Sequence, residues 1–126
     1  MMDPKKCKYT KEHEWIMVED RFATIGISDY AQGELGDIVF VQLPEIGKEV
    51  KQMESFGTIE AVKAVSELFS PVSGKVVEVN TELESQPELI NKQAMDGGWI
   101  IKVELSNPSE LDNLLTYDEY QTFIGK

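Results

Sequence analysis

Glu60-Ala61-Val62-Lys63-Ala64-Val65 is the stretch that decides how the fold of this chain is interpreted, because it sets one lysine between two β-prone runs. The flanking runs, Phe56 to Val62 and Val65 to Phe69, are rich in β-branched and aromatic residues and predict two strands. Lys63 therefore falls where a hairpin turns. The turn chemistry is poor, because these residues contain no Asn-Gly or Asp-Gly pair. Taken alone, the pattern favours an ordinary exposed lysine.

Strand signals continue on both sides of this hairpin. Ile38 to Leu43 is an apolar run closed by Pro44, which is typical of a buried strand. Ile101, Val103 and Leu105 alternate with charged residues, which is typical of a half-exposed strand. Other short β-prone runs predict strands at Glu14 to Val18, Phe22 to Ile27 and Lys75 to Val79.

Helix signals are few and short. Ser28 to Leu35 predicts a short helix stopped by Gly36, and Ser85 to Glu88 predicts a single turn. Asn107-Pro108-Ser109-Glu110 combines a cap residue, a proline and an acid, and Thr116 to Glu119 has capping-box spacing. The predicted architecture is mainly β, with short peripheral and C-terminal helices.

Length and charge narrow the class of protein. The 126 residues predict one domain, 1–126, with a flexible N-terminus at 1–8 and a C-terminal helical segment at 107–126. No apolar run approaches the ~20 residues that span a bilayer, and no secretory signal is recognisable, so we expect a cytoplasmic protein. The net charge of −11 argues against nucleic acid and anionic membranes and favours partners with basic patches.

Catalytic motifs are absent from the sequence. Cys7 is the single cysteine, lies in the N-terminus expected to be flexible, and has no partner for a disulfide. His13 is the single histidine and is interpreted as a structural or surface residue beside Trp15. We find no Gly-rich phosphate loop, no serine nucleophile motif and no metal-ligand cluster. The sequence therefore predicts a protein that is not an enzyme.

Several motifs, in order from about Tyr9 to Ile124, together carry a resemblance to a known family. They are Tyr9 to Trp15, Ala23 to Gln32, Leu35 to Pro44, Glu60 to Ala64, Ser70 to Gly74, Glu78 to Asn80, Pro87 to Asn91 and Gly98-Trp99. This ordered set resembles the H proteins of the glycine cleavage system, which are lipoyl carriers. The lysine motif alone is moderately specific, whereas the ordered set is highly specific.

The resemblance implies a barrel-sandwich hybrid fold, as in lipoyl and biotinyl carriers, with Lys63 at a hairpin tip and amide-linked to lipoic acid. It implies a monomer that serves glycine decarboxylase, an aminomethyltransferase and a dihydrolipoyl dehydrogenase, after modification by a lipoyl-attaching enzyme. It also implies that Glu14 and Glu67 contact the parked arm. The competing interpretation for both acids is a solvated surface carboxylate.

The chain departs from the family pattern at two places. Ala61 stands where the family usually has serine, and the 92–97 loop lacks the usual Pro-Tyr-like pair, so its conformation is open. The alternatives are a lipoyl domain of a 2-oxo acid dehydrogenase, a biotin carrier, an unmodified binding module, and an H-like protein that relays lipoyl groups. The biotin alternative is disfavoured, because biotinyl lysines usually sit between methionines.

Overall fold

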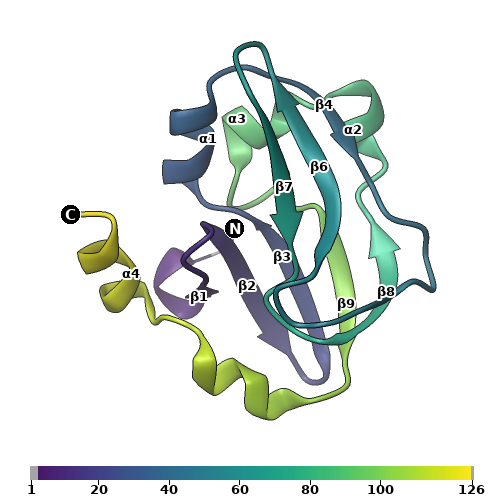
Figure 1. Ribbon diagram of the computed structural model, residues 1–126, viewed down its shortest axis with the longest axis vertical. Coiled ribbons are helices and arrows are strands. Elements are labelled where there is room, and N and C mark those ends of the chain that lie inside the picture. Colours follow the sequence, from purple (N-terminus) through teal and green to yellow (C-terminus); the bar gives the residue numbers. More distant parts are fainter. Residues whose placement is uncertain (1–2, 126) are drawn as a thin grey trace.

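The computed structural model describes residues 3–125 and consists of two antiparallel sheets with short helices around them (Figure 1). The larger sheet has the strand order β1 (Lys8–Tyr9), β2 (Glu14–Glu19), β3 (Phe22–Ile27), β9 (Ile101–Leu105), β8 (Gly74–Val79) and β5 (Glu49–Val50). The smaller sheet has the order β4 (Ile38–Gln42), β6 (Ser55–Ala61) and β7 (Val65–Phe69). The predicted mainly β sandwich with peripheral helices is confirmed.

One hydrophobic core joins the two sheets. Ile25 and Val103 from the larger sheet and Ile59 and Leu68 from the smaller sheet are all at most 1% exposed and belong to the same cluster. Their positions follow the alternation of side chains along each strand, which sends every second residue toward the facing sheet. The core therefore fixes the β6–β7 hairpin rigidly to the larger sheet.

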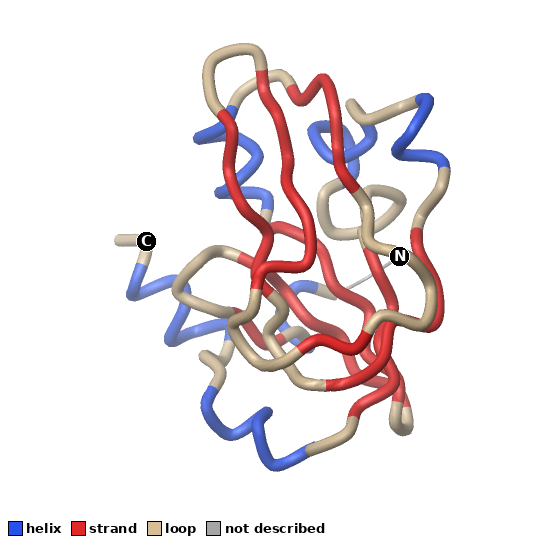
Figure 2. Tube along the Cα trace, turned by 45° about the vertical axis from the view of Figure 1, so that its right-hand side comes forward, coloured by secondary structure: helices blue, strands red, loops and turns tan. Residues whose placement is uncertain are grey.

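The helices are short and lie at the edges of the sheets (Figure 2). The predicted capping box is confirmed, because Thr116 and Glu119 form it in full, and Ser28, predicted as the first residue of a helix, caps α1 by accepting from the Ala31 N–H. Asn107 precedes a 3-10 helix rather than an α-helix. The elements are η1 (Pro4–Lys6), α1 (Asp29–Leu35), α2 (Glu82–Ser85), α3 (Leu89–Gln93), η2 (Pro108–Asn113) and α4 (Tyr117–Phe123).

The N-terminal segment differs from the expectation of a flexible tail at 1–8. Residues 1–2 lie outside the described part of the chain, residues 3–6 are exposed and include the 3-10 helix η1, and the chain packs against the fold from Cys7 onward. Cys7 is 2% exposed, and the Tyr9 hydroxyl donates to the Pro4 carbonyl over 2.7 Å. Burial, with Asp3 adding to it, raises the pKa of the Cys7 thiol to about 11, so the thiol stays protonated. A second cluster that includes Tyr9, Trp15 and Tyr120 explains the order of this segment.

Strand β4 is not the fully buried strand that its apolar run predicted. Val39 is 53% exposed and Phe40 is 51% exposed. The register with β6 shifts between Ile38 and Phe40, which breaks the simple alternation of inward and outward side chains. The outer face of the smaller sheet therefore presents apolar side chains to solvent.

The loop at 92–97, which departs from the family pattern, is held by hydrogen bonds from Trp15 of β2 and from Asn80, which follows β8. The Trp15 Nε1–H donates to the Ala94 carbonyl over 2.9 Å. The Asn80 side-chain amide donates to the carbonyls of Gly97 and Trp99. Ala94 is only 4% exposed, so this loop is part of the packed structure.

Candidate functional site

Lys63 lies at the tip of the β6–β7 hairpin, which projects at the top of Figure 1. The Ala61 N–H donates to the Ala64 carbonyl over 2.7 Å and closes a tight turn without an Asn-Gly pair. Lys63 is exposed, and within residues 3–125 it makes no hydrogen bond or ion pair. The hairpin therefore presents an amine that is accessible to another protein.

The tip rests on the connection between α1 and β4. The Val62 N–H donates to the Asp37 carbonyl over 3.0 Å, which ties the turn to this connection. Gly36 has a φ of +82°, and a Cβ there would lie 3.2 Å from the Lys63 Cε. Glycine at position 36 thus allows a left-handed backbone and leaves room for the lysine side chain.

Asn91 of α3 also holds the connection between α1 and β4. Its amide donates to the Gly36 carbonyl over 2.8 Å and to the Gln32 Oε1 over 3.0 Å, and its Oδ1 accepts from the Ile38 N–H over 2.9 Å. One side chain therefore links α1, the start of β4 and α3. This explains why residues far from Lys63 in sequence belong to the frame of the tip.

A cleft of about 290 Å³ lies between α1 and the β7 strand. Its carboxyl groups come from three parts of the chain: Glu12 and Glu14 lie just before and at the start of β2, Glu34 is in α1, and Glu67 is in β7. Its apolar lining includes Leu68 and Leu35. Such a cleft accommodates an apolar chain that ends in a cation.

Glu14 is not a solvated surface acid, because its side chain is buried and the residue is 1% exposed. One carboxyl oxygen accepts from the Thr10 hydroxyl over 2.5 Å, and the other accepts from the Phe69 N–H over 3.3 Å. The carboxyl thereby bridges β2 of the larger sheet and β7 of the smaller sheet. Burial raises the pKa of Glu14 to about 8, although these two hydrogen bonds act in the opposite direction.

Glu67 also lines the cleft, but it is exposed. Along β7 the exposed residues Val65 and Glu67 alternate with Ser66 and Leu68, which are more buried. Alternation thus brings Ser66 toward the cleft, a residue that the sequence analysis did not single out. The alternation of side chains between the two faces of β7 is the signal that would have identified Ser66.

His13 lies in the wall of the cleft, where the sequence predicted only a structural or surface histidine. Its Nδ1 is 2.8 Å from the Tyr120 hydroxyl, which is itself 2.7 Å from the Ser28 hydroxyl. Burial lowers the pKa of His13, opposed by Glu12 and Glu34. The sequence analysis therefore did not identify Glu34 and His13 as residues that line the cleft.

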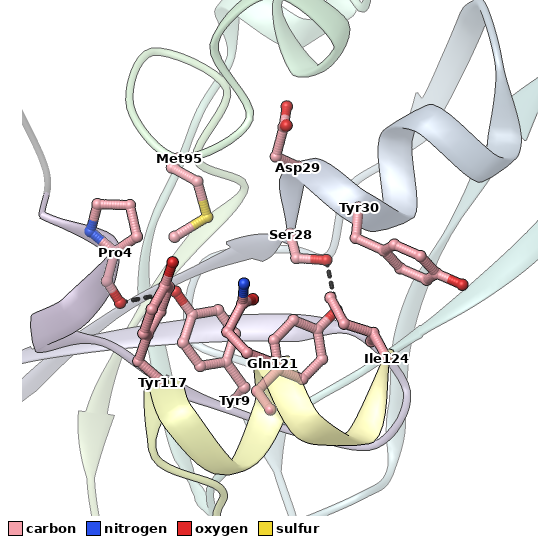
Figure 3. Close-up of a pocket in the computed structure, with 10 residues that line it drawn as sticks. Pro4, Tyr9, Ser28, Asp29, Tyr30, Met95, Tyr117, Gln121 and Ile124 are labelled. Carbon is pink, nitrogen blue, oxygen red and sulfur yellow. Dashed lines mark hydrogen bonds between the residues drawn. The ribbon is translucent and has the colours of Figure 1, made fainter. Parts of the chain in front are cut away.

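A second cavity, of about 310 Å³, lies on the α4 side of the molecule (Figure 3). Tyr9 lines it together with Tyr117 and Gln121 of α4 and with Ile124, which follows that helix. No residue of the β6–β7 hairpin takes part in its lining. It is therefore separate from the lysine tip.

Two further classes of site find no support between residues 3 and 125. No group of three or more His, Cys, Asp or Glu side chains there is arranged to hold a metal ion. No helix in the same part of the chain has the length and apolar character needed to cross a membrane.

An exposed lysine on a rigid hairpin above an acidic cleft defines a carrier domain, which presents a covalently attached group to other proteins. The model of the glycine cleavage H-protein family matches residues 7–126, and the chain belongs to that family. The family match sets aside the biotin carrier and the lipoyl domain of a 2-oxo acid dehydrogenase.

Relatives and a solved structure agree over nearly the whole chain. It is 56% identical to a glycine cleavage system H protein of Staphylococcus haemolyticus, over all of both chains. It is 60% identical to one of Symbiobacterium thermophilum, over 95% of this chain and 94% of that protein. The crystal structure of an H protein from Mycobacterium marinum matches with a TM-score of 0.91 and 38% identity, over 98% of this chain and 100% of that one.

Membership of this family establishes the role of the chain. It is a carrier of the glycine cleavage system rather than a catalyst, and it bears covalently attached lipoate. It passes an aminomethyl group from the decarboxylase to the aminomethyltransferase and electrons to the dihydrolipoyl dehydrogenase.

Proposed function

We propose that Lys63 is the attachment residue for lipoate and that the cleft beside it holds the arm between visits to the partner enzymes. The observation that carries the first part is the exposed Lys63 amine at the tip of a hairpin anchored by the core. A rigid tip with a long tether gives each partner a high effective concentration of the reactive end without tight binding. The lipoyl group supplies the disulfide that takes up cargo and electrons.

We further propose that Glu14 recognises the aminomethyl cargo in the cleft. The amine of that cargo is cationic when protonated, whereas the oxidised arm is neutral. A buried carboxylate therefore forms a charge-assisted hydrogen bond only with the loaded state, which contributes about 1.5–3 kcal/mol. Glu67 is a weaker candidate for the same contact, because its exposure leaves it screened by water.

The raised pKa of Glu14 adds a step to this recognition. With a pKa of about 8 in the empty cleft, the Glu14 carboxyl is largely protonated at neutral pH. An ammonium beside it favours the ionised form, so arrival of the cargo releases a proton from Glu14. The Thr10 hydroxyl and the Phe69 N–H then remain as hydrogen-bond donors to the ionised carboxylate.

The assignment of Lys63 is tested by mass spectrometry of the protein after incubation with a lipoyl-attaching enzyme and its activated lipoyl donor. We expect one lipoyl adduct, on the peptide that contains Lys63. Lys63→Arg should remain unmodified, because a guanidinium is a poor nucleophile, while Lys75→Arg should be modified like the parent. An adduct on the Lys63→Arg protein would show that another lysine carries the group.

We also propose that the protein works as a monomer in the cytoplasm. The named bacterial relatives and the absence of a membrane-spanning helix between residues 3 and 125 support this location. The net charge of −11 supports a freely diffusing monomer, because like-charged copies repel one another.

A further inference from the structure

The outer face of the β4–β6–β7 sheet carries an apolar row that the core does not use. Phe40 pairs with Glu60, and Glu60 pairs with Val65, so these three residues form one row across the three strands. Phe40 is 51% exposed and Val65 is 66% exposed. We call Phe40, Glu60 and Val65 the outer row.

The outer row lies directly beside the turn that presents Lys63. The next residues toward the tip, Ala61 and Ala64, are joined by the hydrogen bond that closes the turn. Val62, which precedes the lysine, is 75% exposed. The amine at the tip is therefore bordered by apolar side chains on its own hairpin and on the neighbouring strand.

Packing of the fold does not explain this exposure. The inward residues of the same sheet, such as Ile59 and Leu68, complete the core without help from the outer row. A β-branched residue at position 65 suits a strand, but an aromatic side chain at position 40 leaves a large apolar surface in water. Aromatic side chains of this kind are enriched among the residues that dominate binding energies at protein interfaces.

The chemistry of each partner decides which one this surface fits. The enzyme that attaches lipoate must bring its activated acyl carbon to about 3 Å from the Lys63 Nζ, so its surface must cover the residues around the tip. Partners that act on the far end of the arm reach it across the length of the tether. Only the attaching step requires the bare tip to be held closely.

We propose that the outer row is the docking surface for the lipoyl-attaching enzyme, which meets it with an apolar pocket rimmed by basic groups. Glu60 within the row supplies the complementary charge. Docking there holds Nζ while an amide bond forms to the lipoyl carbonyl. The bond to the activating group breaks with its electron pair, and Nζ loses a proton to solvent.

This inference rests on the assignment of Lys63 and extends it to the partner that modifies it. The test measures the initial rate of lipoyl attachment against the concentration of unmodified protein, with the purified attaching enzyme and its activated lipoyl donor. We expect Phe40→Ser to raise the apparent KM about tenfold or more, as truncation of an interface anchor does. Val65→Thr preserves shape and strand preference, and we expect it to raise the KM several-fold.

Ile46→Ser is the matched control, because Ile46 is 65% exposed but lies in the connection between β4 and β5. It should be modified at the parent rate. After prolonged incubation, fully lipoylated Phe40→Ser should react with dihydrolipoyl dehydrogenase at the parent KM. Circular dichroism melting of each variant checks that the fold is kept, and Val65→Thr remains informative if Phe40→Ser does not fold.

Each contrary outcome contradicts one identifiable part of the proposal. If Val65→Thr and a folded Phe40→Ser are lipoylated at the parent rate, the outer row is not the docking surface. The same conclusion follows if Ile46→Ser loses as much of the attachment rate as they do. In both cases Lys63 remains the attachment site. An equal rise in KM for the dehydrogenase shows a general partner surface instead. A parent protein that dimerises through Phe40 assigns the row to a second copy. Attachment of lipoate to another lysine in the parent overturns the assignment of Lys63 itself.

Discussion

The Nδ1 of His13 lies 2.8 Å from the hydroxyl of Tyr120, which joins the wall of the acidic cleft to the C-terminal helix α4. The two residues are separated by 107 positions in sequence. Because the Ser28 hydroxyl also bonds to Tyr120, it can donate to Tyr120 while Tyr120 donates to His13. In that arrangement the proton of a neutral His13 sits on Nε2.

Tyr120→Phe tests this relationship. The ring stacks on Tyr9 at a centroid distance of 4.5 Å and is kept, while the loss of the hydroxyl leaves His13 and Ser28 without their partner. We expect a loss of roughly 1–3 kcal/mol in the free energy of unfolding. We also expect the ¹⁵N chemical shifts of His13 to move from the Nε2–H form toward a mixture of tautomers. Tyr117→Phe, on the same helix, is the control. Unchanged His13 chemical shifts in Tyr120→Phe would contradict the hydrogen bond from Tyr120 to His13.

The pKa of Glu14 predicts how stability changes with pH. The carboxyl titrates near 4.5 when unfolded and at about 8 when folded, so between these values the folded state binds the extra proton. The free energy of unfolding therefore falls as pH rises through this window, by at most about 1.4 kcal/mol per pH unit from this group. Glu14→Gln has no proton to lose. We expect its stability relative to the parent to improve steadily from pH 5 to pH 8.

Urea unfolding at pH 5, 6.5 and 8 measures this difference. Glu67→Gln, at an exposed position, is the control and should run parallel to the parent across the same range. Parallel curves for Glu14→Gln as well would mean that the folded protein does not hold a proton on Glu14.

Glu14→Gln should also shorten the lifetime of the aminomethyl-loaded protein. The variant keeps the shape of the side chain but has one acceptor oxygen where the carboxyl group uses two, and it removes the charge that faces the cationic cargo. We expect spontaneous loss of the aminomethyl group, in the absence of the transferase, to be several-fold faster, because ionising a carboxyl of pKa about 8 at pH 7 offsets about 1.4 kcal/mol of the charge-assisted bond. A loss as slow as in the parent would show that Glu14 does not hold the cargo.

Gly36→Ala tests how the lysine side chain is accommodated beside α1. A Cβ at position 36 would combine an unfavourable φ of +82° with a contact of 3.2 Å to the Lys63 Cε. Gly47→Ala is the matched control, because Gly47 has a φ of +96° and nothing within 4 Å of its Cβ position. We expect both variants to lose about 1–2 kcal/mol of stability. The ¹³C signal of the Lys63 Cε should shift only in Gly36→Ala. An unchanged signal in that variant would show that the Lys63 side chain does not lie beside position 36.

Local signals in the sequence were sufficient for most of the secondary structure. The strands at Phe22–Ile27 and Val65–Phe69 have the predicted bounds, and the capping box at Thr116 forms as predicted. Strand alternation, capping and turn-forming residues act over a few positions, so a short window of sequence contains the physical cause. The prediction that Val39 and Phe40 lie in a buried strand was wrong, because the register shift that exposes them depends on pairing with β6.

By itself, the sequence determined that the chain is mainly β and, through its resemblance to a family, that Lys63 lies at a turn of functional interest. Only the tertiary structure decided that Glu14 is buried between two sheets and that His13 bonds to Tyr120. The physical reason is that burial and charge state depend on which distant segments pack together. The solvation of a carboxyl or an imidazole is set by neighbours that lie tens of residues away in the chain, such as Phe69 for Glu14.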